Sequence, residues 1–162
     1  MAGNEEFNLF VYGTLMSPDV FRAVTGRRFV RHLGQTDGAT SFRAREAVLE
    51  GYRKVSFDGT YEYAVPYELG AIEGYVIGPL PCDLMAVLTR YEGRNYIGRI
   101  VRVRVRGEEL TDQGEGNTEI AVAFVGNMER LQGHAGWVGC GVLRRKPHAA
   151  EKPEGDEGYC GC

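Results

Sequence analysis

Only two stretches of this chain have the period of a helix, and most of the remaining sequence before the C-terminal tail is strand-like. The first begins at Ser17-Pro18, an N-cap residue followed by one suited to the first helical position, and ends at Gly26. The second begins at Pro81 and ends at Gly93. Two helices are too few to cover both faces of a doubly wound sheet. The pattern therefore predicts an α+β fold, a small mixed β-barrel that is closed or nearly closed, with two main flanking helices.

Six or seven strands are predicted around these helices. The segment 29–48 is strand-like but is broken near "TDGAT", a hairpin signal. "YAVPYEL" and "AIEGYVIG" are predicted as two further strands that meet around Gly70. "RIVRVRV" alternates, so its apolar residues, Ile100 among them, are assigned to one side of a strand and its arginines to the other. The remaining strands are 7–12 and "TEIAVAFV".

The length and composition predict one domain with one hydrophobic core. A chain of 162 residues with 43% hydrophobic content can bury such a core. After Cys140 the sequence changes to Lys, Glu, Pro and Gly without periodicity. We therefore expect a domain over 1–142 and a polar, flexible tail over 143–162.

The charge balance argues against a nucleic-acid partner. The net charge is −3, from 19 basic and 22 acidic residues, whereas electrostatic binding to phosphates requires an excess of positive charge. No apolar stretch approaches the length of a membrane span. The start "MAGNEEF" has neither the basic nor the apolar region of a secretory signal, so a cytoplasmic protein is expected. The sequence leaves the oligomeric state open.

Cysteine and histidine spacing predicts no metal site and no cofactor. No cysteine pair has C-x-x-C spacing, and the three histidines are scattered. Cys160 and Cys162 form "CGC" in the tail, which suits a soft metal or oxidation, but two reduced thiols on a loose tail are the simpler interpretation.

Glu92 is a carboxylate on the predicted buried face of the second helix. It lies four residues after Leu88 and eight after Leu84. Burial there costs free energy unless the carboxylate is paired or faces a cleft. Desolvation and the negative end of the helix dipole both disfavour its ionised form, so both raise its pKa. A carboxylate with a raised pKa can accept a proton and return it, which makes Glu92 a candidate general acid/base.

A structural interpretation of Glu92 competes with the catalytic one. The side chain can turn outward at a frayed helix end, or it can pair with a neighbouring arginine. The candidate partners are Arg90, Arg94 and Arg99.

The stretch "LFVYGTLMSP" predicts a binding site for a small anion. An apolar strand reaches Tyr12, turns at Gly13 and runs into the helix that begins at Ser17-Pro18. Unpaired backbone N–H groups and the positive end of a helix dipole converge at such a corner. A carboxylate is a natural ligand there, although a Tyr-Gly-Thr turn alone is a common composition.

Together these blocks resemble a known family. "VYGTLMSPDVFRAVTG", then "AIEGYVIGPLPCDLMAVLTRYEG" and a following Tyr, resembles the gamma-glutamyl cyclotransferase superfamily over residues 8–125. The gamma-glutamylamine cyclotransferase branch, which includes the plant avirulence-induced proteins, is the most similar. The resemblance implies a small mixed β-barrel with flanking helices.

The resemblance also implies roles for six residues. It places the catalytic glutamate at Glu92 and a second site tyrosine at Tyr96. The family often has an arginine two residues after that tyrosine, but here it is delayed to Arg99, which therefore receives no role. The turn that binds the amino-acid end of the substrate is made by Tyr12, Gly13, Thr14 and Leu15.

The implied reaction makes 5-oxoproline from a small gamma-glutamyl compound and frees an amine. The substrate's α-amine must lose a proton before it attacks the γ-carbonyl, and the leaving amine must gain one. A single carboxylate can do both, without a metal or a cofactor. The alternative is a non-catalytic module of the same fold that binds a small carboxylate or a protein. The sequence does not identify the leaving amine.

A third interpretation, nucleic-acid binding, comes from the arginines of one predicted strand. A solvated strand face balanced by Glu108 and Glu109 explains them more simply. These arginines are Arg99, Arg102, Arg104 and Arg106.

Overall fold

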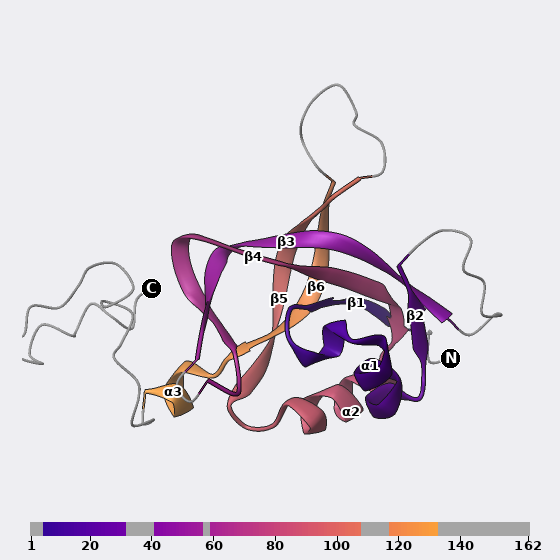
Figure 1. The fold of residues 1–162 in the computed structure, drawn as a ribbon, viewed down its shortest axis with the longest axis horizontal. Coiled ribbons are helices and arrows are strands. Elements are labelled where there is room, and N and C mark those ends of the chain that lie inside the picture. Colours follow the sequence, from indigo (N-terminus) through magenta and orange to yellow (C-terminus); the bar gives the residue numbers. More distant parts are fainter. Residues whose placement is uncertain (1–4, 32–40, 57–58, 108–116, 133–162) are drawn as a thin grey trace, which may run out of the picture.

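A computed structural model describes residues 5–31, 41–56, 59–107 and 117–132 of the chain (Figure 1). These ranges contain six strands, three α-helices and one short 3-10 helix, η1. The predicted tail 143–162 and the segment "TDGAT" lie outside the described residues. The elements are β1 (Glu6–Val11), η1 (Thr14–Met16), α1 (Pro18–Thr25), β2 (Arg28–Val30), β3 (Ser41–Val55), β4 (Tyr63–Pro81), α2 (Asp83–Glu92), β5 (Tyr96–Val105), β6 (Thr118–Gly126) and α3 (Met128–Leu131).

The strands form one mixed sheet that closes into a ring, which confirms the predicted α+β barrel. The strand order is β2-β3-β4-β1-β6-β5, and an additional pairing of β3 with β5 completes the ring. β1 is antiparallel to β4 and parallel to β6, so it forms the junction between the two halves of the sheet. In Figure 1, α1 and α2 lie together on one side of the barrel, below β1.

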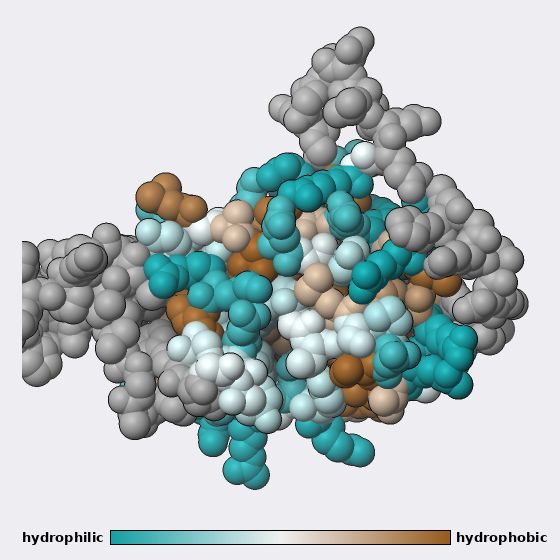
Figure 2. All heavy atoms as spheres, in the orientation of Figure 1, coloured by the Kyte–Doolittle hydropathy of each residue, from teal (hydrophilic) through white to brown (hydrophobic). Residues whose placement is uncertain are grey.

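Two main hydrophobic clusters follow from this arrangement. One fills the barrel and includes Phe10, Leu49, Ile72 and Val103. The other lies between the barrel and the helices, where Phe21 of α1 meets the leucines of α2. Over the described surface seen in Figure 2, polar residues predominate and apolar residues occur as separate spots. This separation of a buried apolar core from a polar surface agrees with the period-two pattern of the strands and the helical period of α1 and α2.

The predicted helix limits are confirmed with one shift. Ser17 is the N-cap of α1, Pro18 is its first residue, and Gly26 ends it in the left-handed conformation, with φ of 71°. α2 begins at Asp83 rather than at Pro81. The reason is that Pro81 is the last residue of β4 and still pairs with β1.

β4 is one continuous strand, so the prediction of two strands that meet around Gly70 is wrong. β3 and β4 pair on both sides of this point. Between the pairs Glu50–Ala71 and Tyr52–Pro66, β4 has four residues, 67–70, where β3 has only Gly51. A Cβ atom on Gly70 would lie 2.2 Å from the carbonyl oxygen of Tyr52. The glycine therefore marks a bulge with a close backbone approach and does not end the strand.

The hairpin predicted between 29 and 48 is also wrong. β2 and β3 pair in parallel, with Arg28 opposite Ser41, whereas the strands of a hairpin are antiparallel. The turn-forming composition of "TDGAT" is a local signal and contains no information about the direction in which the next strand pairs.

Ile100 lies on the arginine face of β5 and not on its apolar face. Its side chain is 79% exposed, whereas Val101, Val103 and Val105 are buried. Strict alternation places residue 100 with residues 102 and 104, so the local period outweighs the hydrophobicity of this side chain.

The described residues contain no helix that is long and apolar enough to cross a bilayer.

Gly74→Ala should destabilise the barrel. A Cβ atom at this position would lie 2.1 Å from the carbonyl oxygen of Val11 and 2.9 Å from the ring of Phe10. Because the first neighbour is backbone, relief requires β1 to move relative to β4. We expect the free energy of unfolding, measured by urea denaturation, to fall by about 2–3 kcal/mol.

Gly98→Ala is the matched control for this experiment. Its added methyl group would meet only side chains, at 3.6 and 3.7 Å, which are ordinary contact distances. We expect this change to alter the free energy of unfolding by less than about 1 kcal/mol. Equal effects of the two substitutions would contradict the close approach of β1 and β4 at Gly74.

Candidate active site

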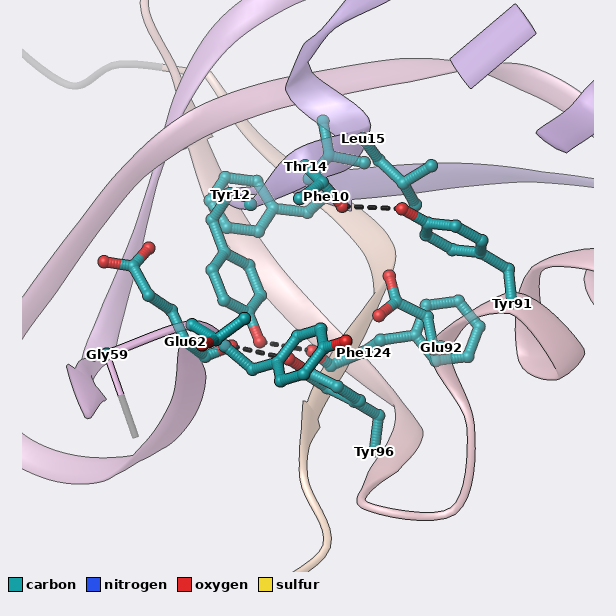
Figure 3. A pocket seen from close by; sticks show the side chains of 14 residues that line it. Phe10, Tyr12, Thr14, Leu15, Gly59, Glu62, Tyr91, Glu92, Tyr96 and Phe124 are labelled. Carbon is teal, nitrogen blue, oxygen red and sulfur yellow. Dashed lines mark hydrogen bonds between the residues drawn. The ribbon is translucent and has the colours of Figure 1, made fainter. Parts of the chain in front are cut away.

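A pocket of about 560 Å³ opens where β1, η1 and the end of α2 meet (Figure 3). Its walls also include residues 59–62, which precede β4, and Phe124 of β6. The structure brings all six residues singled out from the sequence to this pocket. They are Tyr12, Gly13, Thr14, Leu15, Glu92 and Tyr96.

Glu92 is the last residue of α2 and is mostly buried at the pocket. Leu84 and Leu88 of the same helix are buried in the core, as its spacing predicts. Burial raises the pKa of the Glu92 carboxyl from 4.5 to about 7. Figure 3 shows this carboxyl group directed into the pocket, on the side of Tyr91.

The geometry does not support the competing interpretation, in which Glu92 forms an ion pair with a neighbouring arginine. Among the ion pairs between described residues, none includes Glu92. All three candidate arginines lie within the described ranges. Glu92 is therefore a partly desolvated carboxyl group without a cationic partner in the described part of the chain, and it titrates near neutral pH.

The turn after β1 offers three backbone donors at the pocket. η1 is built by Met16 N–H donating to the Gly13 carbonyl at 3.0 Å and Ser17 N–H donating to the Thr14 carbonyl at 3.1 Å. No backbone hydrogen bond among the described residues uses the N–H groups of Gly13, Thr14 or Leu15. These groups are free to bind a small anion.

Leu15 anchors this turn to the core, and Gly13 leaves it open on the other side. The Leu15 side chain is buried in the cluster between barrel and helices, which holds the turn against the core. A Cβ atom on Gly13 would meet no protein atom within 4 Å, so the space beside it is open. The turn is therefore anchored on one side and accessible on the other.

Tyr12 connects this turn to the strands on both sides of β1. Its hydroxyl donates to the carbonyl of Phe124 on β6 and accepts the N–H of Ala64 on β4, at 3.0 Å. Burial raises the pKa of Tyr12, so the hydroxyl keeps its proton. Its predicted contact with substrate stays a prediction, but its contribution to the frame of the pocket is direct.

Tyr96 closes the opposite wall from the start of β5. Its ring stacks on Tyr63 at 4.7 Å between centroids, and its hydroxyl donates to the Glu62 carbonyl at 2.8 Å. Burial also raises the pKa of Tyr96. These contacts hold residue 62, which lines the pocket, next to the barrel. Arg99, which receives no role from the sequence, lines a different hollow.

Sequence reasoning missed two parts of the pocket. Tyr91 received no role from the sequence, yet its hydroxyl lies 2.8 Å from Oγ1 of Thr14. Residues 59–62 precede β4 and carry no periodicity that would place them at a site. Of the described residues that line the pocket, two are carboxylates, Glu62 and Glu92, and none is Lys, Arg or His. The described residues contain no cluster of three or more groups that could hold a metal ion.

Glu92→Gln should stabilise the protein at neutral pH and not at acid pH. The pKa of Glu92 is higher in the folded state, so between about pH 4.5 and 7 the folded protein holds a proton that the unfolded chain has released. Wild-type stability therefore falls as pH rises through this window, while the glutamine does not titrate. The advantage of the variant should grow from near zero at pH 4 to at most about 3 kcal/mol at pH 8.

The same substitution at Glu68, which is exposed, is the control for this measurement. Urea unfolding at pH 4, 6 and 8 gives the comparison. A stabilisation by Glu92→Gln that does not change with pH would contradict a buried carboxyl group with a raised pKa.

Solved structures with the same fold are similar to this chain at low sequence identity. The solution structure of an Arabidopsis thaliana protein matches with a TM-score of 0.57 and 20% identity, and the match covers 78% of this chain and 65% of that one. The chain thus spans less than two thirds of that plant protein. No match was found among curated proteins.

Two further structures carry descriptions of an activity. One, described as a gamma-glutamyl cyclotransferase, matches with a TM-score of 0.51 and 15% identity, over 75% of this chain and 66% of that one. The other is described as a yeast gamma-glutamyl cyclotransferase specific to glutathione. It matches with a TM-score of 0.52 and 11% identity, over 76% of this chain and 69% of that one. At such identities these matches show the fold alone.

The family itself is shown by a match that covers most of the chain. The family model described as "Gamma-glutamyl cyclotransferase, AIG2-like" matches residues 9–137. This range contains the turn after β1, Glu92 and every strand from β2 to β6. The chain belongs to the AIG2-like gamma-glutamyl cyclotransferase family.

Proposed function

We propose that this protein is a gamma-glutamyl cyclotransferase that converts a small gamma-glutamyl compound into 5-oxoproline and a free amine. The observation that carries the proposal is the meeting of two features in one pocket. Glu92 supplies a carboxyl group with a pKa of about 7, and the turn at residues 13–15 supplies N–H groups that make no hydrogen bond within the described part of the chain. The first suits proton transfer and the second suits an anion.

The turn would hold the α-carboxylate of the substrate. Because no basic side chain lies among the described residues of the pocket wall, the α-carboxylate depends on neutral donors, and the backbone N–H groups of Gly13, Thr14 and Leu15 are the backbone donors available to it. Held there, the flexible gamma-glutamyl chain can be folded until its α-nitrogen approaches its γ-carbonyl carbon. Such orientation can lower the activation barrier by several kcal/mol or more, because binding has already removed the conformational freedom that ring closure would otherwise have to remove.

Glu92 would move the protons of the reaction. As a carboxylate it accepts a proton from the α-ammonium group, and the freed amine attacks the γ-carbonyl carbon. A carbon–nitrogen bond forms, Glu92 returns its proton to the leaving nitrogen, and the bond from the carbon to that nitrogen breaks. Glu92 then transfers the second proton of the ring nitrogen to the freed amine, which leaves as an ammonium ion, so the lactam is neutral. The carboxylate is restored and no electrons are gained or lost, so one acid/base residue completes the cycle.

The alternative is a protein of the same fold that binds a small carboxylate or another protein without catalysis. Both functions use the turn, but only catalysis needs a proton acceptor beside it. A screen of gamma-glutamyl amines and gamma-glutamyl amino acids for release of 5-oxoproline separates the two, and the same screen identifies the leaving amine.

Glu92→Gln should remove most of the activity while leaving binding in place. The amide keeps the size of the side chain but cannot accept and return a proton. With the best substrate of the screen, turnover should fall about 100-fold or more. Binding of 5-oxoproline, followed by calorimetry or NMR titration, should persist because the turn is unchanged. Turnover near that of the wild type would remove Glu92 from the mechanism.

The pH dependence of the wild-type enzyme gives an independent test. Free enzyme with a protonated Glu92 cannot accept the ammonium proton, so kcat/KM should fall on the acid side with a midpoint near pH 7, the pKa of this carboxyl group. A midpoint near pH 4.5, the ordinary value for glutamate, would contradict a proton acceptor with a raised pKa.

A further inference from the structure

A bridge of two hydroxyl groups crosses one side of the pocket. The Tyr91 hydroxyl, from the last turn of α2, lies 2.8 Å from Oγ1 of Thr14 in η1, and either atom can be the donor (Figure 3). Both residues line the pocket, and Tyr91 immediately precedes Glu92. The bridge therefore joins the two parts of the site that the proposed reaction requires, the turn and the helix that carries the acid/base.

The fold does not need this bridge to hold the two elements together. Leu15 of η1 is already packed in the same buried cluster as Leu84 and Leu88 of α2. The bridge itself is exposed, and a hydrogen bond open to water adds little to stability. Because the bridge lies at the pocket and adds little to stability, its role is better explained by the binding of a ligand.

Counting protons shows what the bridge can offer to a ligand. Each hydroxyl carries one proton, and the bridge consumes one of the two. Tyr91 and Thr14 have no other hydrogen bond among the described residues, so one hydroxyl proton is left for a ligand. A phenol is a better donor than an aliphatic hydroxyl, whose oxygen is the better acceptor. The favoured arrangement has Tyr91 donating to Thr14, which leaves the Thr14 proton available.

We infer that Tyr91 is a positioning residue, which orients the Thr14 hydroxyl to donate a hydrogen bond to the α-carboxylate of the substrate. The inference rests on the proposed function. Thr14 would add a side-chain donor to the backbone N–H groups of the same turn, at a site whose described wall has no basic residue. Accepting a bond from Tyr91 fixes the rotamer of Thr14 and polarises its O–H group, so its own donation is strengthened.

The test is a double-mutant cycle on the binding of 5-oxoproline, which keeps the α-carboxylate. Thr14→Val removes the donor and should weaken binding about tenfold, as expected for one hydrogen bond to a charged group. Tyr91→Phe removes only the orientation and should weaken binding about threefold. If Tyr91 acts through Thr14, the double variant should bind no more weakly than Thr14→Val alone. Thr14→Ser keeps the hydroxyl and should bind like the wild type.

Tyr67→Phe, which removes a hydroxyl outside the pocket, is the control and should not change binding. Thermal unfolding of each variant should stay close to that of the wild type, which separates binding from stability. With an active substrate, both single variants should raise KM and leave kcat within about threefold, since a contact present before and during ring closure affects binding uniformly.

Two results would overturn the inference while leaving the proposed function intact. Unchanged binding of 5-oxoproline by Tyr91→Phe would show that the bridge does not serve the ligand. Additive losses in the double variant would show that each hydroxyl acts separately. If the wild type neither releases 5-oxoproline from any gamma-glutamyl compound nor binds it, the proposed function fails and this inference fails with it.

Discussion

The buried hydroxyl of Tyr12 is the interaction on which the geometry of the site depends. β1 lies between β4 and β6, and its last pairs with them are at Val11 and Phe10. One residue later, the Tyr12 hydroxyl bonds to the backbone of both neighbouring strands. The chain then leaves the sheet at Gly13 from a point fixed on both sides. The turn that exposes its N–H groups therefore inherits the rigidity of the barrel, which a free loop would lack.

Glu92 illustrates a balance between stability and chemistry. The leucines of its helix face are buried in the core, and the same face carries the carboxyl group into partial burial at the edge of that core. A carboxylate that has no cationic partner among the described residues is costly there, and its raised pKa expresses this cost. A raised pKa is also what allows one group to accept and donate protons near neutral pH. Replacing the charge would stabilise the fold and, under the proposed mechanism, abolish the chemistry.

Much of the fold could be predicted because its signals are local. The caps of α1, the buried face of α2 and the alternation in β5 each depend on residues a few positions apart, and the structure has all three. The errors arose where a local signal has two structural outcomes. Gly70 is compatible with a strand end or with a bulge under close backbone approach, and "TDGAT" does not determine how β2 pairs. Only the partner strand, distant in sequence, decides between such outcomes.

The sequence by itself determined the positions of the two main helices, the acidic residue at the end of α2 and the glycine turn after β1, because spacing and residue type carry that information. Only the tertiary structure decided that these features share one pocket, since closing the ring through β3 and β5 relates segments that no short-range pattern connects. The same holds for the bond between Thr14 and Tyr91, which lie 77 residues apart. The size of the pKa shift of Glu92 is also decided by the tertiary structure, because desolvation depends on every element that packs around the group.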